Sequence, residues 1–176
     1  MKKTLLLVAA LILSVVFTND MNAQEFDPLD KSPLDIARFP YSWRTSDKVV
    51  RVTYSRPQLK GRTVSKLAPA GKKWRLGANE TTEITFYKDV NFGGTDIKAG
   101  TYSMYAIPGE KEWTIALSNQ INVWGAYFHK DENDVARVKA SVSNSKDAYE
   151  AFTIAFGDDM TMYMAWGNTM VSLPIK

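Results

Sequence analysis

Residues 101–117, TYSMYAIPGEKEWTIAL, decide the fold class of this 176-residue chain. On either side of the Pro-Gly-Glu-Lys turn at 108–111, apolar side chains recur at every second position. A period of two is typical of a β-strand, whereas a helix would repeat every ~3.6 residues. In the first run Tyr102 and Tyr105 lie on opposite faces, so both faces are partly apolar. This arrangement indicates a strand in the centre of a sheet.

The same alternation recurs in five further runs, at residues 50–54, 84–88, 152–156, 160–166 and 171–175. Clusters of Gly, Pro, Asn and Asp lie between these runs and are typical of turns. Strands and turns that recur every ~8–12 residues predict a sandwich or barrel of antiparallel strands. We therefore expect an all-β fold, an antiparallel two-sheet sandwich that is jelly-roll-like and has about eight to nine strands. A closed β-barrel is the alternative.

The N-terminus carries the features of an export signal. Two lysines precede an apolar run at residues 5–17, and a polar stretch then ends at the small residue Ala23. This pattern predicts a signal peptide over residues 1–23, cleaved near Ala23-Gln24. The apolar run is shorter than the ~20 residues that a membrane-spanning helix needs. We therefore expect a soluble protein that is secreted or periplasmic.

The mature chain is expected to form one domain with an arm. Residues 24–48 are rich in Pro and Asp and form the arm, and residues 49–176 form the β-sandwich domain. Within the arm, residues 32–38 predict a short helix, because Ser32 suits the N-cap and the next proline suits the first helical position. Residues 145–151 are a second helical candidate. Because the chain has no cysteine, its core alone must stabilise it.

Several distinctive stretches resemble one known protein family. They are YSRPQLKGR at 54–62, LAPAGKKWRLGANETTEITFYKDV at 67–90, IKAGTYSMYAIPGEKEWTIALS at 97–118 and WGAY at 124–127. In this order they resemble the domain-of-unknown-function family 2911, which consists of secreted or periplasmic proteins found mainly in Bacteroidetes-type bacteria. The resemblance covers nearly all of the mature chain. It implies a fold and a compartment but no reaction, because the activity of that family is not established.

The richest polar segment is WRLGANETTEITF at residues 74–86. It contains Arg75, Asn79 and Glu80 at a turn, and an ordinary strand needs none of these polar side chains. Arg56 stands before a proline, which favours an extended backbone. The guanidinium groups of Arg56 and Arg75 are suited to bind a carboxylate, a phosphate or sugar hydroxyls.

Aromatic side chains are the second expected component of this site. The aromatic candidates are Tyr54, Trp74, Tyr102, Tyr105 and Trp124. Large aromatic side chains are mostly buried, and we expect Tyr105 to be the exception that forms part of a pocket wall. The predicted ligand-binding residues are Arg56, Arg75, Asn79, Glu80 and Tyr105. Such a mixture of polar and aromatic groups is typical of a pocket for a small polar molecule or a carbohydrate.

Two alternatives remain for this cluster. Glu80 is the candidate acid or base of a hydrolase that acts on glycans or another envelope-derived substrate, with Glu83 as the nearest second acid. Alternatively, Glu80 pairs with Arg75 or Arg56, and the cluster is a purely structural hub. We favour a non-catalytic protein with a binding or envelope-associated role.

Other chemistries have little support in the sequence. A Ser-His-Asp arrangement would have to use the single histidine, His129, which lies in a charged stretch that we expect to face solvent. One histidine and no cysteine do not suit a transition-metal site, and we expect no cofactor. The formal net charge is only +3, and the one basic cluster is Lys72-Lys73 with Arg75. We therefore expect no nucleic-acid partner.

Overall fold

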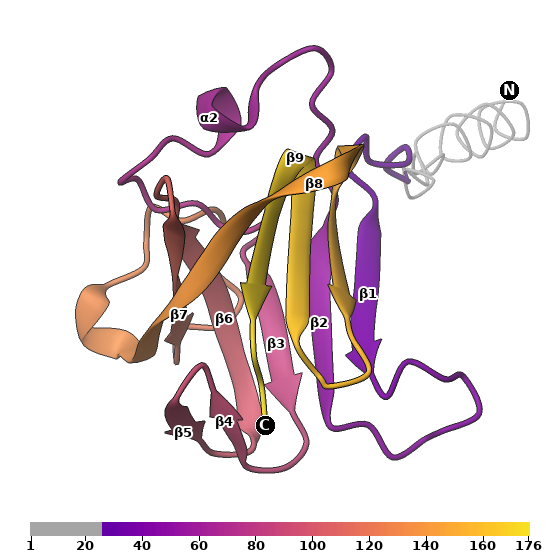
Figure 1. The fold of residues 1–176 in the computed structure, drawn as a ribbon, viewed down its shortest axis with the longest axis vertical. Coiled ribbons are helices and arrows are strands. Elements are labelled where there is room, and N and C mark those ends of the chain that lie inside the picture. The colour runs from indigo at the N-terminus through magenta and orange to yellow at the C-terminus, as the bar shows by residue number, and fades with distance from the viewer. Residues whose placement is uncertain (1–25) are drawn as a thin grey trace, which may run out of the picture.

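The computed structural model describes residues 26–176, and in that range the regular secondary structure is almost all β-strand, joined by loops (Figure 1). The strands are β1 (Leu34–Phe39), β2 (Val50–Ser55), β3 (Thr82–Phe86), β4 (Val90–Phe92), β5 (Thr95–Ile97), β6 (Gly100–Ile107), β7 (Glu112–Ser118), β8 (Asp134–Phe156) and β9 (Met162–Leu173). Two helical turns, α2 (Val64–Leu67) and the 3-10 turn η1 (Asp131–Asn133), lie between strands. The predicted signal peptide lies outside the described residues.

Seven strands form one antiparallel sheet in the order β1-β2-β3-β6-β7-β8-β9. Neighbours in this sheet follow the chain order except at β3 and β6, where the hairpin of β4 and β5 is inserted as a separate small sheet. The large sheet curls like half a barrel (Figure 1). Over the described residues it does not close, because β1 pairs only with β2 and β9 only with β8.

The long strand β8 turns this curled sheet into two facing layers. Its first part pairs with β7 as far as Ser141, and from there it pairs with β9. The second part reaches the segment that follows β2, where the backbone N–H of Phe152 donates to the carbonyl of Pro57 at 2.9 Å. The apolar face is thereby enclosed from two sides. The structure confirms the predicted all-β, sandwich-like fold, and the strand count of the described part agrees with the prediction.

Aromatic side chains form the centre of the core. The indole of Trp74 stacks on Trp166 with ring centroids 5.2 Å apart, and its edge contacts are with Trp113 at 5.8 Å and Phe152 at 4.9 Å. All four rings are buried. Aromatic contacts of this kind add about 0.5–1.5 kcal/mol each beyond the burial of apolar surface. They hold the segment before β3 firmly against β8 and β9.

Both helix predictions were wrong. Residues 34–39 form β1 because β2 offers a complete ladder of hydrogen-bonding partners, in register from Leu34 opposite Ser55 to Phe39 opposite Val50. This tertiary pairing outweighs the local capping signal at Ser32. Residues 145–151 belong to β8, where Tyr149 pairs with Gly167 of β9 and Ala151 with Gln58, although the register of the ladder is interrupted on either side of Tyr149.

Candidate functional site

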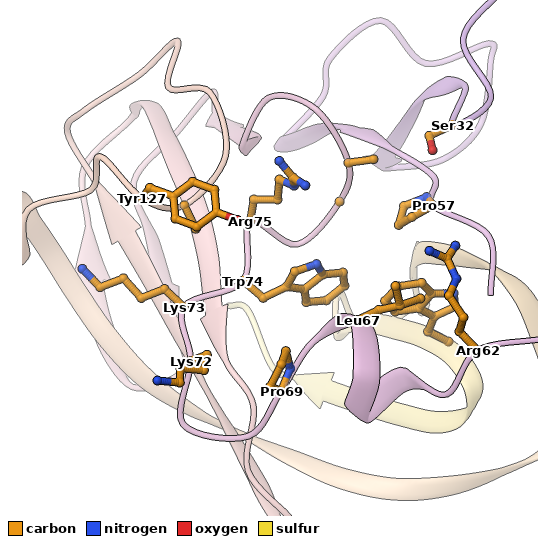
Figure 2. A pocket seen from close by; sticks show the side chains of 14 residues that line it. Ser32, Pro57, Arg62, Leu67, Pro69, Lys72, Lys73, Trp74, Arg75 and Tyr127 are labelled. Atoms are coloured by element: carbon orange, nitrogen blue, oxygen red, sulfur yellow. The ribbon is translucent and has the colours of Figure 1, made fainter. Parts of the chain in front are cut away.

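A groove of about 660 Å³ opens beside Trp74, and we call it the Trp74 groove (Figure 2). Segments far apart in the chain build its walls. Its lining residues are Ser32, Pro57, Arg62, Leu67, Pro69, Lys72, Lys73, Trp74, Arg75, Gly77, Ala78, Ala126, Tyr127 and Trp166. The segment from 67 to 78 supplies more than half of them, so the polar motif recognised in the sequence does border a concave surface.

The turn that carries Arg75 is fixed by both its backbone and its packing. Trp74 exchanges two backbone hydrogen bonds with Ala106 of β6, at 2.7 and 2.8 Å. Gly77 comes so close to Ser55 of β2 that an added β-carbon would lie 3.0 Å from its carbonyl oxygen. This close approach to the backbone favours glycine at that position. The Nη1 atom of Arg75 donates to the carbonyl of Asn79 at 3.0 Å, which closes the turn.

Four cationic side chains line the groove, and among the described lining residues there is no Asp or Glu. Two of the four cations are engaged elsewhere. Lys73 lies 2.5 Å from Asp131, and Arg62 donates to backbone carbonyls, including that of Leu59 at 2.8 Å. Lys72 is exposed and makes no ion pair within residues 26–176, and Arg75 uses only Nη1 there. Lys72 and Arg75 therefore have donors available for an anion.

The groove also presents polar and aromatic groups that are free for a ligand. The Nε1–H of Trp74 makes no hydrogen bond within the described part of the chain, and Figure 2 shows the indole at the centre of the groove. By contrast, the Nε1–H of Trp166 donates to the carbonyl of Glu150 at 3.2 Å. Tyr127 forms one wall, and 86% of its surface is exposed. Its ring face is thus accessible to a ligand.

Of the predicted site residues, only Arg75 lines this groove. Arg56 does not line the groove. Its guanidinium donates to Asp35 at 3.2 Å, to Thr153 at 2.7 Å and to the carbonyl of Phe152 at 3.1 Å. It therefore links β1, β2 and β8. The predicted pair of guanidinium groups acting on one ligand is not present in this arrangement.

Asn79 and Glu80 also point away from the groove. The Nδ2 atom of Asn79 donates to Asp30 of the arm at 3.0 Å. Glu80 is exposed and lines a separate hollow of about 70 Å³ together with Glu83. Within residues 26–176 Glu80 forms no ion pair with Arg56 or Arg75, so that structural alternative does not describe the observed contacts.

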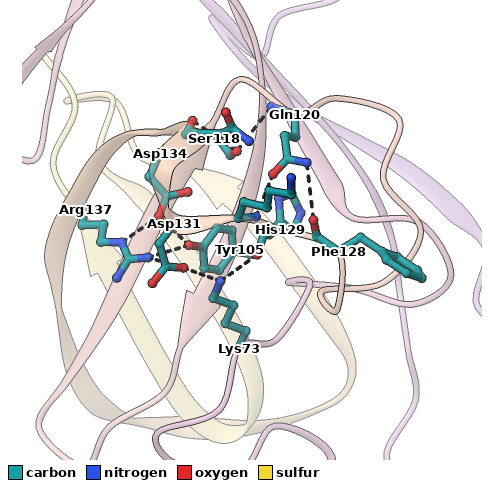
Figure 3. A network of polar contacts seen from close by, with 11 residues as sticks. Lys73, Tyr105, Ser118, Gln120, Phe128, His129, Asp131, Asp134 and Arg137 are labelled. Atoms are coloured by element: carbon teal, nitrogen blue, oxygen red, sulfur yellow. Dashed lines mark hydrogen bonds and ion pairs between the residues drawn. The ribbon is translucent and has the colours of Figure 1, made fainter.

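Tyr105 is completely buried, in contrast to its predicted place in a pocket wall. It does lie on the opposite face of β6 from the core residue Met104, but the ring of His129 stacks against it there. Its hydroxyl donates to Asp134 at 2.6 Å and accepts from Arg137 at 3.1 Å (Figure 3). Arg137 also pairs with Asp131 at 2.7 Å.

His129 belongs to the same network, and the prediction that it faces solvent was wrong. Only 5% of its surface is exposed, and its ring stacks on Tyr105. The Thr81 hydroxyl donates to the carbonyl of Gly125, so it accepts from the Nε2–H of His129 at 3.1 Å. The Nδ1 atom is buried without a partner in the described residues.

The surroundings shift the pKa values of this network in directions that follow from burial and charge. Burial raises the pKa of Tyr105, and its hydrogen bond to Asp134 adds to the effect. Burial also lowers the pKa of His129, as does the nearby charge of Lys73. The hydrogen bond from Lys73 lowers the pKa of Asp131. Tyr105 is therefore a hydrogen-bond donor and His129 is neutral at neutral pH.

Sequence reasoning missed Tyr127, and it assigned Trp124 to the core although 58% of its surface is exposed. Both belong to the long loop between β7 and η1, which carries no strand periodicity.

Within the described residues no three His, Asp or Glu side chains gather into a metal-binding group. No helix of this range is long and apolar enough to cross a bilayer.

Comparison with known proteins gives one finding. A family model described as "Protein of unknown function (DUF2911)" matches residues 37–175. Searches of curated proteins and of solved structures found no match. The family match begins within β1, extends to Ile175 and includes every residue of the Trp74 groove except Ser32. The chain therefore belongs to the DUF2911 family, as the resemblance of its strands and turns predicted.

Proposed function

We propose that this is an exported, non-catalytic binding protein that holds a small anionic ligand in the Trp74 groove. The proposal rests on one observation, the positive charge of the groove. Among the described residues, the lining contains four cationic side chains and no carboxylate. Like charges gathered around one groove repel one another, and within residues 26–176 only Lys73 of these four has its charge offset by an ion pair. An anion in the groove would offset this repulsion.

The groups with free donors favour recognition of oxygen atoms. Arg75 retains N–H groups beyond the one that binds Asn79, and Lys72 has a free ammonium group within the described chain. Charge-assisted hydrogen bonds from such donors are about twice as strong as neutral ones. The Nε1–H of Trp74 would add a neutral donor at the floor of the groove. A carboxylate, a phosphate or a sulfate would satisfy this set.

The hydrolase alternative has less support in the geometry. Glu80 and Glu83 share a hollow of about 70 Å³. Ligand pockets usually enclose about 300–1,000 Å³, so a sugar ring does not fit there. The groove of suitable size has no acid in its described lining. The structural-hub alternative describes Arg56 well, because its donors bind Asp35, Thr153 and a carbonyl.

The second part of the proposal is that the protein is exported from the cytoplasm. The export signal predicted at residues 1–23 would place the protein in the periplasm or outside the cell, where anionic envelope components are available ligands. Cell fractionation of the native protein, with sequencing of its mature N-terminus, tests this part. Recovery of the uncleaved chain in the cytoplasm would contradict it.

The binding proposal is tested by thermal shift and calorimetry with sulfate and phosphate. We expect both anions to raise the melting temperature, because they bind the folded chain only. Arg75→Gln and Lys72→Gln should each weaken binding by about tenfold. Lys88→Gln is the matched control, since Lys88 is exposed in the turn between β3 and β4, at the other end of the sheet from α2 (Figure 1). An equal loss in the Lys88 variant would mean that the anions bind nonspecifically.

A further inference from the structure

Arg75 Nη1 and the Tyr127 ring both lie close to Gly125, and their shared position narrows the class of ligand. A β-carbon placed on Gly125 would lie 3.1 Å from the Tyr127 ring and 3.4 Å from Arg75 Nη1. The backbone at Gly125 has φ +69°, a conformation that favours glycine. The absence of a side chain at this position allows both the guanidinium and the aromatic ring to come close to the backbone of Gly125.

The loop that carries Tyr127 is held in place on both sides. Gly125 donates its N–H to Asn79 at 3.0 Å, and Thr81 donates its N–H to Val123 at 2.8 Å. Further along, Lys130 donates its N–H to the Gln120 side chain at 2.7 Å. The exposed ring of Tyr127 is therefore displayed on an ordered loop. Less conformational entropy is lost when a ligand binds to such a surface.

We infer that the ligand is an acidic glycan, whose uronate ring stacks on Tyr127 while its carboxylate binds Arg75. This inference rests on the proposed anion-binding function of the Trp74 groove. A uronate carries its carboxylate directly on a ring with an apolar C–H face, so one sugar residue can contact both groups at once. An aromatic face attracts such C–H groups, and a guanidinium binds a carboxylate through two parallel hydrogen bonds.

The remaining donors match the rest of a sugar. The hydroxyl groups of a uronate accept hydrogen bonds, and Trp74 Nε1–H and the Lys72 ammonium group are free donors on the same groove. The volume of about 660 Å³ is within the usual range for a ligand larger than a single inorganic anion. A nucleotide fits less well, because its ribose separates the phosphate from the planar base, whereas Arg75 Nη1 and the Tyr127 ring both lie beside Gly125.

The test is a calorimetric titration of the protein with four probes. They are a short oligogalacturonate, its methyl-esterified form, sulfate and AMP. The methyl ester keeps the sugar rings but removes their charge. We expect the oligogalacturonate to bind at least about tenfold more tightly than either sulfate or the methyl ester, and more tightly than AMP.

Variants then separate the two contacts. Tyr127→Ala should weaken binding of the oligogalacturonate by about tenfold and leave sulfate binding unchanged, whereas Tyr127→Phe should keep both. Arg75→Gln should weaken both probes. Phe128→Ala is the matched control: Phe128 is the next residue, 68% exposed, does not line the groove and points away from the network in Figure 3. It should change neither affinity.

The outcomes distinguish this inference from the proposal beneath it. If sulfate binds through Arg75 but the oligogalacturonate binds no more tightly, or if Tyr127→Ala has no effect on it, the glycan inference is wrong and the anion groove stands. Tighter binding of AMP would overturn the inference in the same way. If neither sulfate nor the oligogalacturonate binds, both the inference and the proposed function are wrong.

Discussion

The imidazole of His129 stacks on the phenol ring of Tyr105, with ring centroids 4.9 Å apart and an angle of 26° between the ring planes. Residues that lie far apart in the chain thus meet beneath the loop that forms one wall of the Trp74 groove. The histidine has one hydrogen bond, to Thr81, and its Nδ1 has no described partner. A second proton on this ring would therefore be buried next to Lys73 without an acceptor.

The stability of the fold should consequently decrease in mild acid. The unfolded chain takes up the His129 proton with the ordinary pKa of 6.5, whereas the folded chain takes it up only at lower pH. As the pH falls through 6.5, the unfolded state gains the proton first, so the free energy of unfolding decreases until the pH reaches the lowered pKa. Above 6.5 the contribution is fully present. Urea unfolding between about pH 7.5 and 5 measures this slope.

His129→Gln is the variant that isolates the effect. Glutamine has no proton to gain in this range, so the slope above about pH 5 should become smaller even if the variant is less stable overall. The carboxyl groups whose pKa values are lowered, Asp89, Asp131 and Asp159, lose their contribution only in stronger acid. Identical slopes for the two proteins would show that His129 is not the titrating group.

Tyr105→Phe should destabilise the protein although the aromatic ring remains. The substitution removes a hydroxyl that donates to Asp134 at 2.6 Å and accepts from Arg137 at 3.1 Å. Loss of one partner in a buried, charged network typically reduces the free energy of unfolding by about 1–3 kcal/mol. Tyr41→Phe is the control, because Tyr41 is 78% exposed and should change stability by less than about 0.5 kcal/mol. Equal values for the two variants would contradict a structural role of the network.

Arg56→Gln should reduce stability and leave ligand binding intact. The variant loses the hydrogen bonds to Asp35, Thr153 and the Phe152 carbonyl that connect three strands. Because the guanidinium is partly exposed, we expect a decrease of about 1–2 kcal/mol in urea unfolding. Sulfate affinity, measured by calorimetry, should be that of the natural protein. A loss of sulfate affinity without a loss of stability would place Arg56 in the binding site after all.

The strands were predictable from the sequence because alternation with a period of two reports directly on one buried face. Val50, Val52, Ile84, Met104 and Ile115 are all buried as expected. The first strand and the middle of β8 were not predictable in this way. Residues 143–150 of β8 are largely exposed, so no apolar alternation marks them. Only Ser143, Asn144 and Tyr149 of this stretch pair with β9, and a local pattern does not contain such distant partners.

The candidate site was predictable only in its location along the chain. The segment at 74–86 does border the groove, but its polar residues diverge because a turn, not a strand, connects them. Arg75 turns into the groove, Asn79 turns to the arm and Glu80 faces a separate hollow. Tyr127 lies outside that segment, and its place near Gly125 and Arg75 depends on the course of the loop between β7 and η1.

The hairpin of β4 and β5 offers a test of how tightly the open side of the curled sheet is packed. Its turn contains Gly93 and Gly94, which both have positive φ, +55° and +97°. An added β-carbon at Gly93 would lie 2.8 Å from Leu173 Cδ1 and 3.0 Å from Val138, both of them buried. At Gly94 it would meet no atom within 4 Å.

Alanine at each position therefore separates backbone strain from overpacking. Both variants carry the strain of a positive φ, about 1–2 kcal/mol. Only Gly93→Ala also forces its methyl group into Leu173 and Val138, which typically destabilises by about another 1–3 kcal/mol. In urea unfolding, the free energy of unfolding of Gly93→Ala should therefore be lower than that of Gly94→Ala by about 1–3 kcal/mol, the cost of overpacking. Equal stabilities would mean that the hairpin can move away from β8 and β9 at little cost, and that it does not help to seal the core.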